Sequence, residues 1–232
     1  LALPLRRFAT CGLALLLALP GLGFAQTLFA VGDPAAPGAV ILNRVLTVNP
    51  ATGAATAICP NLSFHTAAMA VSPVDGLVYY IEQNVANPRL NTINPGNPLG
   101  TNCVTGAIRN TTLPAVTIRS TFCPDGRLYA SSNTLQFFEI NPATGATVRT
   151  LNFTGLTTGA SGDFACVNNG DLYILSLTTT GGNANQYTLF RANAAALQGA
   201  ASGGNVAAAA VGALGLAAAP NGLSEVAAGL GG

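Results

Sequence analysis

The six-residue sequence NPATGA occurs twice in this chain, starting at Asn49 and at Asn141. A related INPGNP places its Asn-Pro at Asn94 and a degraded version aligns at Asn193, so the four starts are 45, 47 and 52 residues apart. A second motif, an apolar run followed by a turn that ends in glycine, alternates with the first. Its glycines are Gly76, Gly126, Gly170 and Gly222, at spacings of 50, 44 and 52 residues. Two interleaved markers with a shared period of roughly four dozen residues predict a repeat protein.

Each repeat predicts four short strands. In the third copy an apolar run at Thr121–Cys123 enters a Pro-Asp-Gly turn, where Pro presets φ and Gly accepts a positive φ. A second strand with an aromatic residue follows at Leu128–Tyr129, a third covers Leu135–Ile140 and a fourth Ala146–Phe153. The intervening NPATG is predicted to be a hairpin turn, because Pro lacks the amide hydrogen that a strand ladder needs. The alanine-rich stretch Ala192–Ala201 predicts a turn or two of helix.

Four-stranded units repeated every 40 to 50 residues predict an all-β fold, a β-propeller of four-stranded antiparallel blades. The pairing of Pro-Asp-Gly-x-Leu-Tyr and Asn-Pro-Ala-Thr-Gly motifs resembles the secreted bacterial propellers of the NHL, YVTN and quinoprotein-like group, from Leu28 to about Glu225. These motifs are turn and packing signals, so the resemblance implies an architecture and no particular activity. WD signatures and the tryptophan-docking motif of quinoproteins are missing, which argues against those subfamilies and against a quinone cofactor.

The predicted propeller domain covers residues 26–232, and its blade number has two interpretations. The predicted repeats lie near residues 27–59, 64–112, 115–153 and 161–209. The first repeat lacks an innermost strand, and residues 213–219 resemble one, so they are expected to complete the first blade beside residues 27–59 and give about four blades. The competing interpretation is a chain that carries part of a larger ring, since the Ala- and Gly-rich sequence after Gln198 is a poor strand former.

Residues 1–25 have the pattern of a secretory signal peptide. Arg6 and Arg7 precede the apolar run Cys11–Ala25, which ends in small residues and predicts cleavage before Gln26. The run is shorter than the ~20 residues that a spanning helix needs, so we expect no stable membrane span after cleavage. The protein is therefore expected to be secreted, periplasmic or held at the cell surface.

Charge excludes some partners. After residue 25 the chain has seven Arg, no Lys and eight acidic residues, so its formal charge is 7 − 8 = −1, without a basic tract. Nucleic acids and anionic membranes therefore have no electrostatic basis for binding. Proteins, glycans and other cell-surface components remain as partners.

Four cysteines follow the signal peptide, and export favours disulfides. Cys123 and Cys166 occupy matched positions at the ends of innermost strands of adjacent repeats, near the ~7 Å Cα limit for a bridge. We predict a Cys123–Cys166 bond and, by elimination, a Cys59–Cys103 bond. Free buried thiols are the alternative.

Candidate ligand-binding residues gather in the longer connections, which the repeat model places at one end of a central channel. These candidates are His65, Glu82, Arg89, Asp163, Asn183 and Gln186. His65 is the only histidine, and an ordinary loop histidine is the simpler explanation for it. Sequences of the gluconolactonase type hold a divalent metal with acidic and amide side chains. Glu82, Asn84, Asp163 and Asn183 approximate such a set without matching that family's motifs, so channel Ca or Zn is an alternative to our expectation of no cofactor.

Two functions of different class follow. The first is a secreted or envelope-associated non-enzymatic propeller with a binding or scaffold role. The second is a secreted, metal-dependent lactonase- or lyase-like enzyme. The first is favoured because the chain has one His and lacks HExxH, GxSxG, P-loop and Cys-x-x-Cys motifs, so no catalytic residue is assigned.

Overall fold

The computed structural model covers the whole chain and describes residues 28–31, 44–59, 62, 65–83, 85–96, 103, 106–156, 162–178 and 186–214. The expected signal peptide at residues 1–25 lies outside these ranges. Within them the strands group in sequence order into four antiparallel units, which we number one to four. No helix in the same ranges is long and apolar enough to cross a membrane.

The units are built as follows. The first unit contains β1 (Leu28–Val31), β2 (Val45–Val48) and β3 (Ala55–Cys59). The second contains β4 (Ala68–Val71), β5 (Val78–Ile81), β6 (Arg89–Ile93) and β7 (Arg109–Asn110). The third contains β8 (Thr117–Phe122), β9 (Leu128–Ser132), β10 (Phe137–Ile140) and β11 (Thr147–Thr154). The fourth contains β12 (Gly162–Cys166), β13 (Leu172–Thr178), β14 (Gln186–Ala192), the helix α1 (Ala194–Gly199) and β15 (Gly204–Ala213).

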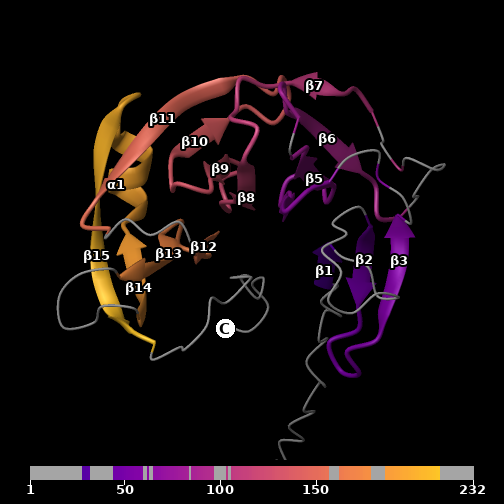
Figure 1. Ribbon diagram of the computed structural model, residues 1–232, viewed down its shortest axis with the longest axis horizontal. Helices are drawn as coiled ribbons and strands as arrows, with labels where there is room; N and C mark the ends of the chain where they lie inside the picture. Colours follow the sequence, from indigo (N-terminus) through magenta and orange to yellow (C-terminus); the bar gives the residue numbers. More distant parts are fainter. Residues whose placement is uncertain are drawn as a thin grey trace, which may run out of the picture.

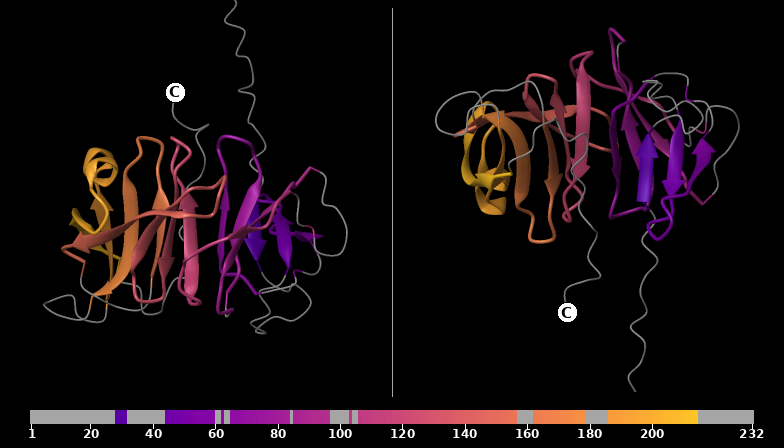
Figure 2. Two further views of the ribbon diagram at one scale, coloured as in Figure 1. Left: turned by 90° about the horizontal axis from the view of Figure 1, so that it is seen from above. Right: turned by 60° about the horizontal axis from the view of Figure 1, so that its bottom comes forward.

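The units follow one another along an arc, with β1–β3 at one end and β12–β15 at the other (Figure 1). In the side views of Figure 2 the sheets stand side by side, as blades of a β-propeller do. The fold is therefore all-β with propeller-like blades, as the period of the sequence predicts.

Both NPATGA copies form the same hairpin turn. The carbonyl oxygen of Asn49 accepts the amide of Gly53 at 2.8 Å, and that of Asn141 accepts the amide of Gly145 at 2.8 Å. Each Asn side chain also accepts the amide two residues further on, at 2.9 Å. The glycines have φ of 70° and 79°, the left-handed region that favours glycine. The predicted hairpin is confirmed.

In the fourth unit the helix α1 takes the place of this hairpin. Its N-cap Asn193 accepts the amide of Ala195 through Oδ1 at 2.9 Å. Leu197 is the buried residue of the helix and joins the apolar core between the third and fourth units. The short helix expected from the alanine-rich sequence is confirmed.

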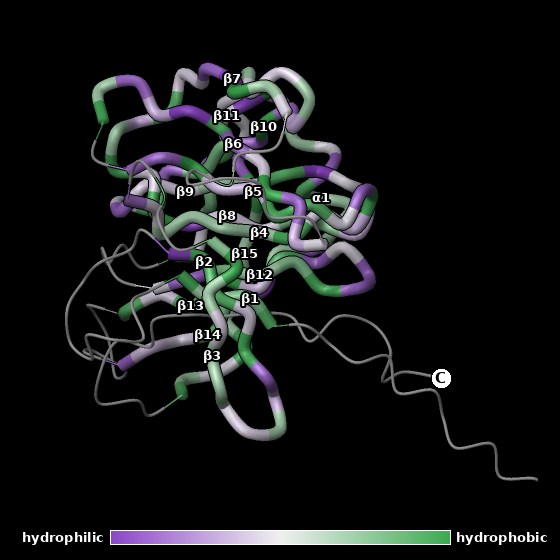
Figure 3. The backbone as a smooth tube through the Cα atoms, turned by 90° about the vertical axis from the view of Figure 1, so that its right-hand side faces the viewer, coloured by the Kyte–Doolittle hydropathy of each residue, from purple (hydrophilic) through white to green (hydrophobic). Residues whose placement is uncertain are grey.

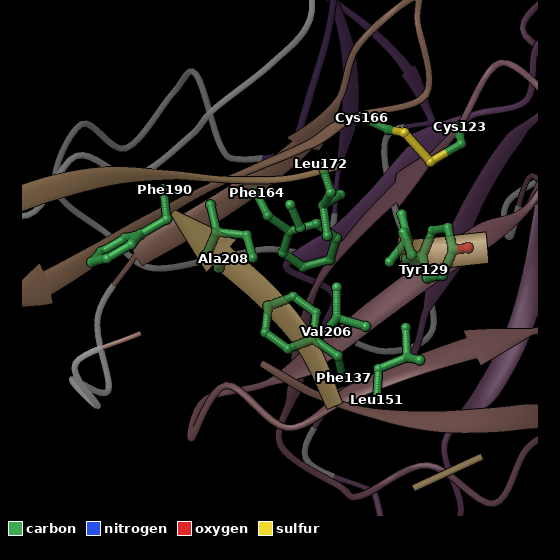
Figure 4. Packing of buried hydrophobic residues seen from close by; sticks show 13 residues of the cluster. Cys123, Tyr129, Phe137, Leu151, Phe164, Cys166, Leu172, Phe190, Val206 and Ala208 are labelled. Carbon is green, nitrogen blue, oxygen red and sulfur yellow. A yellow bond between two sulfur atoms is a disulfide. The ribbon is translucent and has the colours of Figure 1, made fainter. Parts of the chain in front are cut away.

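Each apolar core lies between two successive units. The ring centroids of Phe137 in the third unit and Phe164 in the fourth are 5.1 Å apart (Figure 4). Tyr79 of the second unit and Phe122 of the third meet edge to face at 5.1 Å. A smaller core with Val45 and Tyr80 joins the first unit to the second. The units are thus held by burial of their facing sides, the main favourable term in folding.

The third and fourth units share one sheet of eight strands, which the sequence did not predict. The first half of β15 pairs in parallel with β11, beginning with Leu151 opposite Gly204, and its second half pairs antiparallel with β14. Figure 2 shows β11 crossing from the third unit toward the fourth. The two units are therefore joined along their outer edges by backbone hydrogen bonds.

The expected completion of the first unit remains a prediction. Among the described residues β1 pairs with β2 alone, so the first unit has three strands. Ala213, expected at the start of the completing strand, instead ends β15 opposite Thr188. Residues 215–219 lie outside the described ranges.

Candidate functional site

Both expected disulfides are present. Cys59–Cys103 joins the first and second units with Cα atoms 5.7 Å apart, and Cys123–Cys166 joins the third and fourth with Cα atoms 5.0 Å apart. The second lies at the margin of the apolar core in Figure 4. All four residues are at least 98% buried. These cysteines are therefore structural, and none is an accessible thiol.

Glu82 and Arg89, two of the candidate ligand-binding residues, bind each other across the connection between β5 and β6. Arg89 donates through Nε to Oε2 of Glu82 at 2.7 Å, and the Nδ2 of Asn91 donates to Oε1 at 3.2 Å. Glu82 is 2% exposed, whereas the Arg89 side chain is 32% exposed. The hydrogen bond that Arg89 donates to Glu82 raises the pKa of Arg89. Both carboxylate oxygens of Glu82 are therefore occupied by protein donors.

Two buried side chains, those of Tyr80 and Asn91, lie beside this pair. Tyr80 lies on β5 opposite Asn91 and is 2% exposed. Burial, together with the charge of Glu82, raises the pKa of the Tyr80 phenol. The Oδ1 of Asn91 is a buried acceptor without a hydrogen-bond partner among the described residues. Asn91 was not anticipated, because an Asn inside an apolar strand reads as an ordinary strand residue until its partner Glu82 is placed.

The backbone of His65 contacts the connection between β5 and β6, which contains Glu82. Its carbonyl oxygen accepts the amide of Gln83 at 2.8 Å, while the residue is exposed. Gln186 begins β14, opposite Thr178. Asn84 and Asn183 lie outside the described residues.

Asp163 is at the other end of the arc, on β12 of the fourth unit, so it belongs to a different sheet from Glu82. Its Oδ1 accepts the amide of Phe164 at 2.8 Å. The adjoining residue, Gly162, accepts a hydrogen bond from Nε of Arg119 on β8, and Arg119 also donates to the carbonyl of Ser132 at 3.1 Å. Arg119 is 8% exposed. Burial lowers its pKa, and the charges of Asp163 and Tyr187 act in the opposite direction.

Arg119 is a residue that the sequence analysis missed. Its position in an innermost strand was the available signal, because a charged residue there must be buried with partners. Ser131, its cross-strand neighbour, is fully buried, and its hydroxyl has no hydrogen-bond partner among the described residues. The contact from Arg119 to Gly162 spans the third and fourth units near the Thr154–Gly162 connection.

The six carboxylates in the described part of the chain all have structural partners. These are Asp75 with Tyr79, Glu82 with Arg89, Asp125 with Arg127, Glu139 with Arg149, Asp163 with Phe164 and Asp171 with Arg191. No three His, Cys, Asp or Glu residues within those ranges lie close enough to hold a metal ion. These six carboxylates therefore stabilise turns and join strands.

Comparisons with known proteins identify no family for this sequence. No protein-family model and no curated protein matches the sequence. Similar solved structures are β-propeller proteins and include hydrazine synthase of Kuenenia stuttgartiensis, with 13% identity, TM-score 0.46, and coverage of 73% of this chain and 43% of that one. Another is the calcium-binding protein regucalcin of Agrobacterium tumefaciens, with 12% identity, TM-score 0.42, and coverage of 63% and 51%.

A third is a nidogen/laminin complex, with 14% identity, TM-score 0.43, and coverage of 66% of this chain and 52% of that one. This chain thus spans about half the length of the structures it matches, between 43% and 52% for these three. Identities this low transfer no activity from those proteins to this one.

Proposed function

We propose that the protein is a secreted or envelope-associated β-propeller of about four blades that binds or scaffolds a protein or cell-surface component and has no catalytic activity. The observation that carries this proposal is the engagement of all six described carboxylates by structural donors. A hydrolytic or lyase site needs a carboxylate, imidazole or metal that is poised for substrate. The two disulfides support an oxidising location after removal of residues 1–25.

We place the binding surface at the end of the predicted channel that carries the connections 59–66, 83–89, 154–162 and 176–186. Connections at this end differ in length from unit to unit, whereas the NPATG turns at the opposite end share one geometry. Variable connections on a repeated frame are where specificity usually resides. The exposed His65 and the partly exposed Arg89 belong to the proposed surface, together with Gln186.

Two exposed alanines provide a matched test of this placement. Ala86 lies in the connection between β5 and β6, and Ala51 lies in the first NPATG turn at the opposite end. We expect Ala86→Glu to lower binding of the labelled protein to an isolated cell-surface fraction at least tenfold, and Ala51→Glu to leave it unchanged. Protease treatment of the fraction then separates a protein partner from a glycan. Equal effects of both substitutions would remove the support for this surface.

The enzymatic alternative has its own test. The purified protein is equilibrated with Ca²⁺ or Zn²⁺, and bound metal is measured together with hydrolysis of a simple aldonolactone. We expect no stoichiometric metal and no hydrolysis. Metal-dependent turnover that disappears in both Glu82→Gln and Asp163→Asn would overturn the proposed function in favour of a lactonase-like enzyme.

A further inference from the structure

The strand β15 changes partner halfway along its length. Residues 204–207 pair with β11, and Ala208–Ala213 pair with β14 on the opposite edge. Beyond Thr154, the last partner in β11, no strand among the described residues continues along the first edge. Along this edge the second half of β15 therefore has no strand partner within the described part of the chain; it lies at the outer rim of the arc, where Figure 1 shows it in yellow.

This edge is not covered by side chains. Val211 is 58% exposed and Leu214 is 45% exposed, and the residues from 209 to 213 are all exposed. The register with β14 shifts between Leu189 and Phe190, where Val211 is the extra residue, so its side chain is not confined by a cross-strand neighbour. An apolar strand is thus open to solvent over about half of its length.

Apart from the bulge at Val211, the protections that usually guard an exposed edge are missing from β15 among the described residues. Such edges normally carry Lys, a proline or an inward-pointing charge, or they are very short. The chain has no charged residue between Arg191 and Glu225, and β15 contains no proline. From Val206 to Ala213 its residues are Val, Ala and Gly. Figure 3 colours the described backbone by hydropathy. By contrast, β7, the outermost strand of the second unit, has two residues, one of which is Arg109.

We propose that this half of β15 is a self-association surface, on which the same segment of a second copy pairs antiparallel across a two-fold axis. Two identical strands in that orientation satisfy each other's donors and acceptors. A surface that binds its own copy around a two-fold axis closes at two subunits. The absence of charge removes repulsion between the copies, and the small Ala and Gly side chains allow the backbones to approach. Val211 and Leu214 lose exposed apolar surface when the strands pair.

The partner is a second copy because the edge is matched to itself. A charged peptide gains no complementary charge along Ala208–Ala213. The outermost strand of the first unit, β3, also has one strand partner only among the described residues, but it has five residues against ten in β15. Pairing between β3 of one copy and β15 of another joins unlike surfaces, so it gives open chains of subunits rather than dimers.

The test is the oligomeric state of the mature chain from Gln26 with both disulfides formed. Sedimentation velocity from about 1 to 200 μM should show a reversible monomer–dimer equilibrium, as expected of a small interface. Val211→Lys should lower the association constant at least tenfold. Val148→Lys is the matched control, because Val148 is 55% exposed on β11 and lies away from the open edge; it should leave the equilibrium unchanged.

Other outcomes overturn the proposal. If the protein is a monomer at every concentration, the edge of β15 does not pair with a second copy. If Ala57→Lys on β3 abolishes the association while Val211→Lys has no effect, the copies associate through β3 and the assignment to β15 is wrong. Circular dichroism and the urea midpoint of each variant establish that it folds. Because the edge is remote from the connection that contains Ala86, a monomeric Val211→Lys protein that still binds the cell-surface fraction separates this association from the proposed function.

Discussion

Glu139 on β10 and Arg149 on β11 lie opposite each other, and the Nε of Arg149 donates to Oε2 of Glu139 at 2.7 Å. The same guanidinium donates to the carbonyls of Leu197 and Gln198 at 2.9 and 3.1 Å, at the C-terminal end of α1. The two charged side chains are 9% and 10% exposed. A helix C-terminus carries partial negative charge, so Arg149 both neutralises Glu139 and caps a helix of the next unit.

Removing this guanidinium should be costly. Arg149→Leu leaves the buried Glu139 with only the more distant guanidinium of Arg127, at 3.9 Å, and uncaps α1. We expect a loss of about 3–5 kcal/mol in the free energy of unfolding. Arg127→Leu is the comparison, because Arg127 pairs with Asp125 at 3.2 Å and reaches Glu139 only at 3.9 Å, and its side chain is 37% exposed; its loss should stay below about 1 kcal/mol. Urea unfolding at neutral pH measures both. Similar losses for the two variants would refute a structural role for the buried pair.

The two copies of NPATGA provide a second comparison, because the same substitution meets different surroundings. Gly53→Ala meets no atom within 4 Å, so we expect only the roughly 1 kcal/mol cost of a left-handed alanine. At Gly145 an added Cβ lies 2.6 Å from the carbonyl oxygen of Asn110 on the second unit. Gly145→Ala should therefore destabilise the protein by roughly 1–3 kcal/mol more than Gly53→Ala, because overpacking adds to the backbone strain. Thermal unfolding of the two variants checks the order, and equal shifts would contradict it.

The sequence predicted features that are encoded locally and repeated. The period of the motifs predicted the strand units, Asn49 and Asn141 predicted two equivalent hairpins, and the alanine-rich stretch predicted α1. The disulfides could be placed because Cys123 and Cys166 hold equivalent positions in successive repeats.

Features that depend on strand register within a unit or on contacts between units were not accessible in this way. The parallel pairing of β11 with β15 has no local signal, since parallel partners distant in sequence are chosen by tertiary packing. Similarly, Glu82 looked like a ligand-binding carboxylate because its partners Arg89 and Asn91 are identified only by the register of β5 with β6. Arg119 was missed for the same reason, because its contact with Gly162 crosses from one unit to the next.

The disulfides should each contribute substantially to stability. Cys123 and Cys166 are 43 residues apart, and closing a loop of this size contributes about 4 kcal/mol in the chain-entropy model. We expect the Cys123→Ser/Cys166→Ser protein to lose stability of this order. Because Cys59–Cys103 joins a different pair of units, removing it as well should give a nearly additive loss. Urea unfolding measures the losses, and peptide mapping without reduction must find these two pairings and no others.

The ion pair of Asp171 should make stability depend on acid pH. Burial would raise the pKa of Asp171, but hydrogen bonds from the amide of Ala194 and from Arg191 and Asn169 outweigh it and hold that pKa below its ordinary value. A carboxylate with a lowered pKa in the folded state stabilises it above the unfolded pKa of about 3.9, and this contribution is lost as the pH falls through the folded value. The stability difference between the native protein and Asp171→Asn should therefore be largest at neutral pH and shrink below about pH 4. Urea midpoints of the two proteins from pH 7 to pH 2.5 measure it directly, and every other titrating group cancels in the comparison. A difference that stays constant over this range would show that the charge of Asp171 does not contribute.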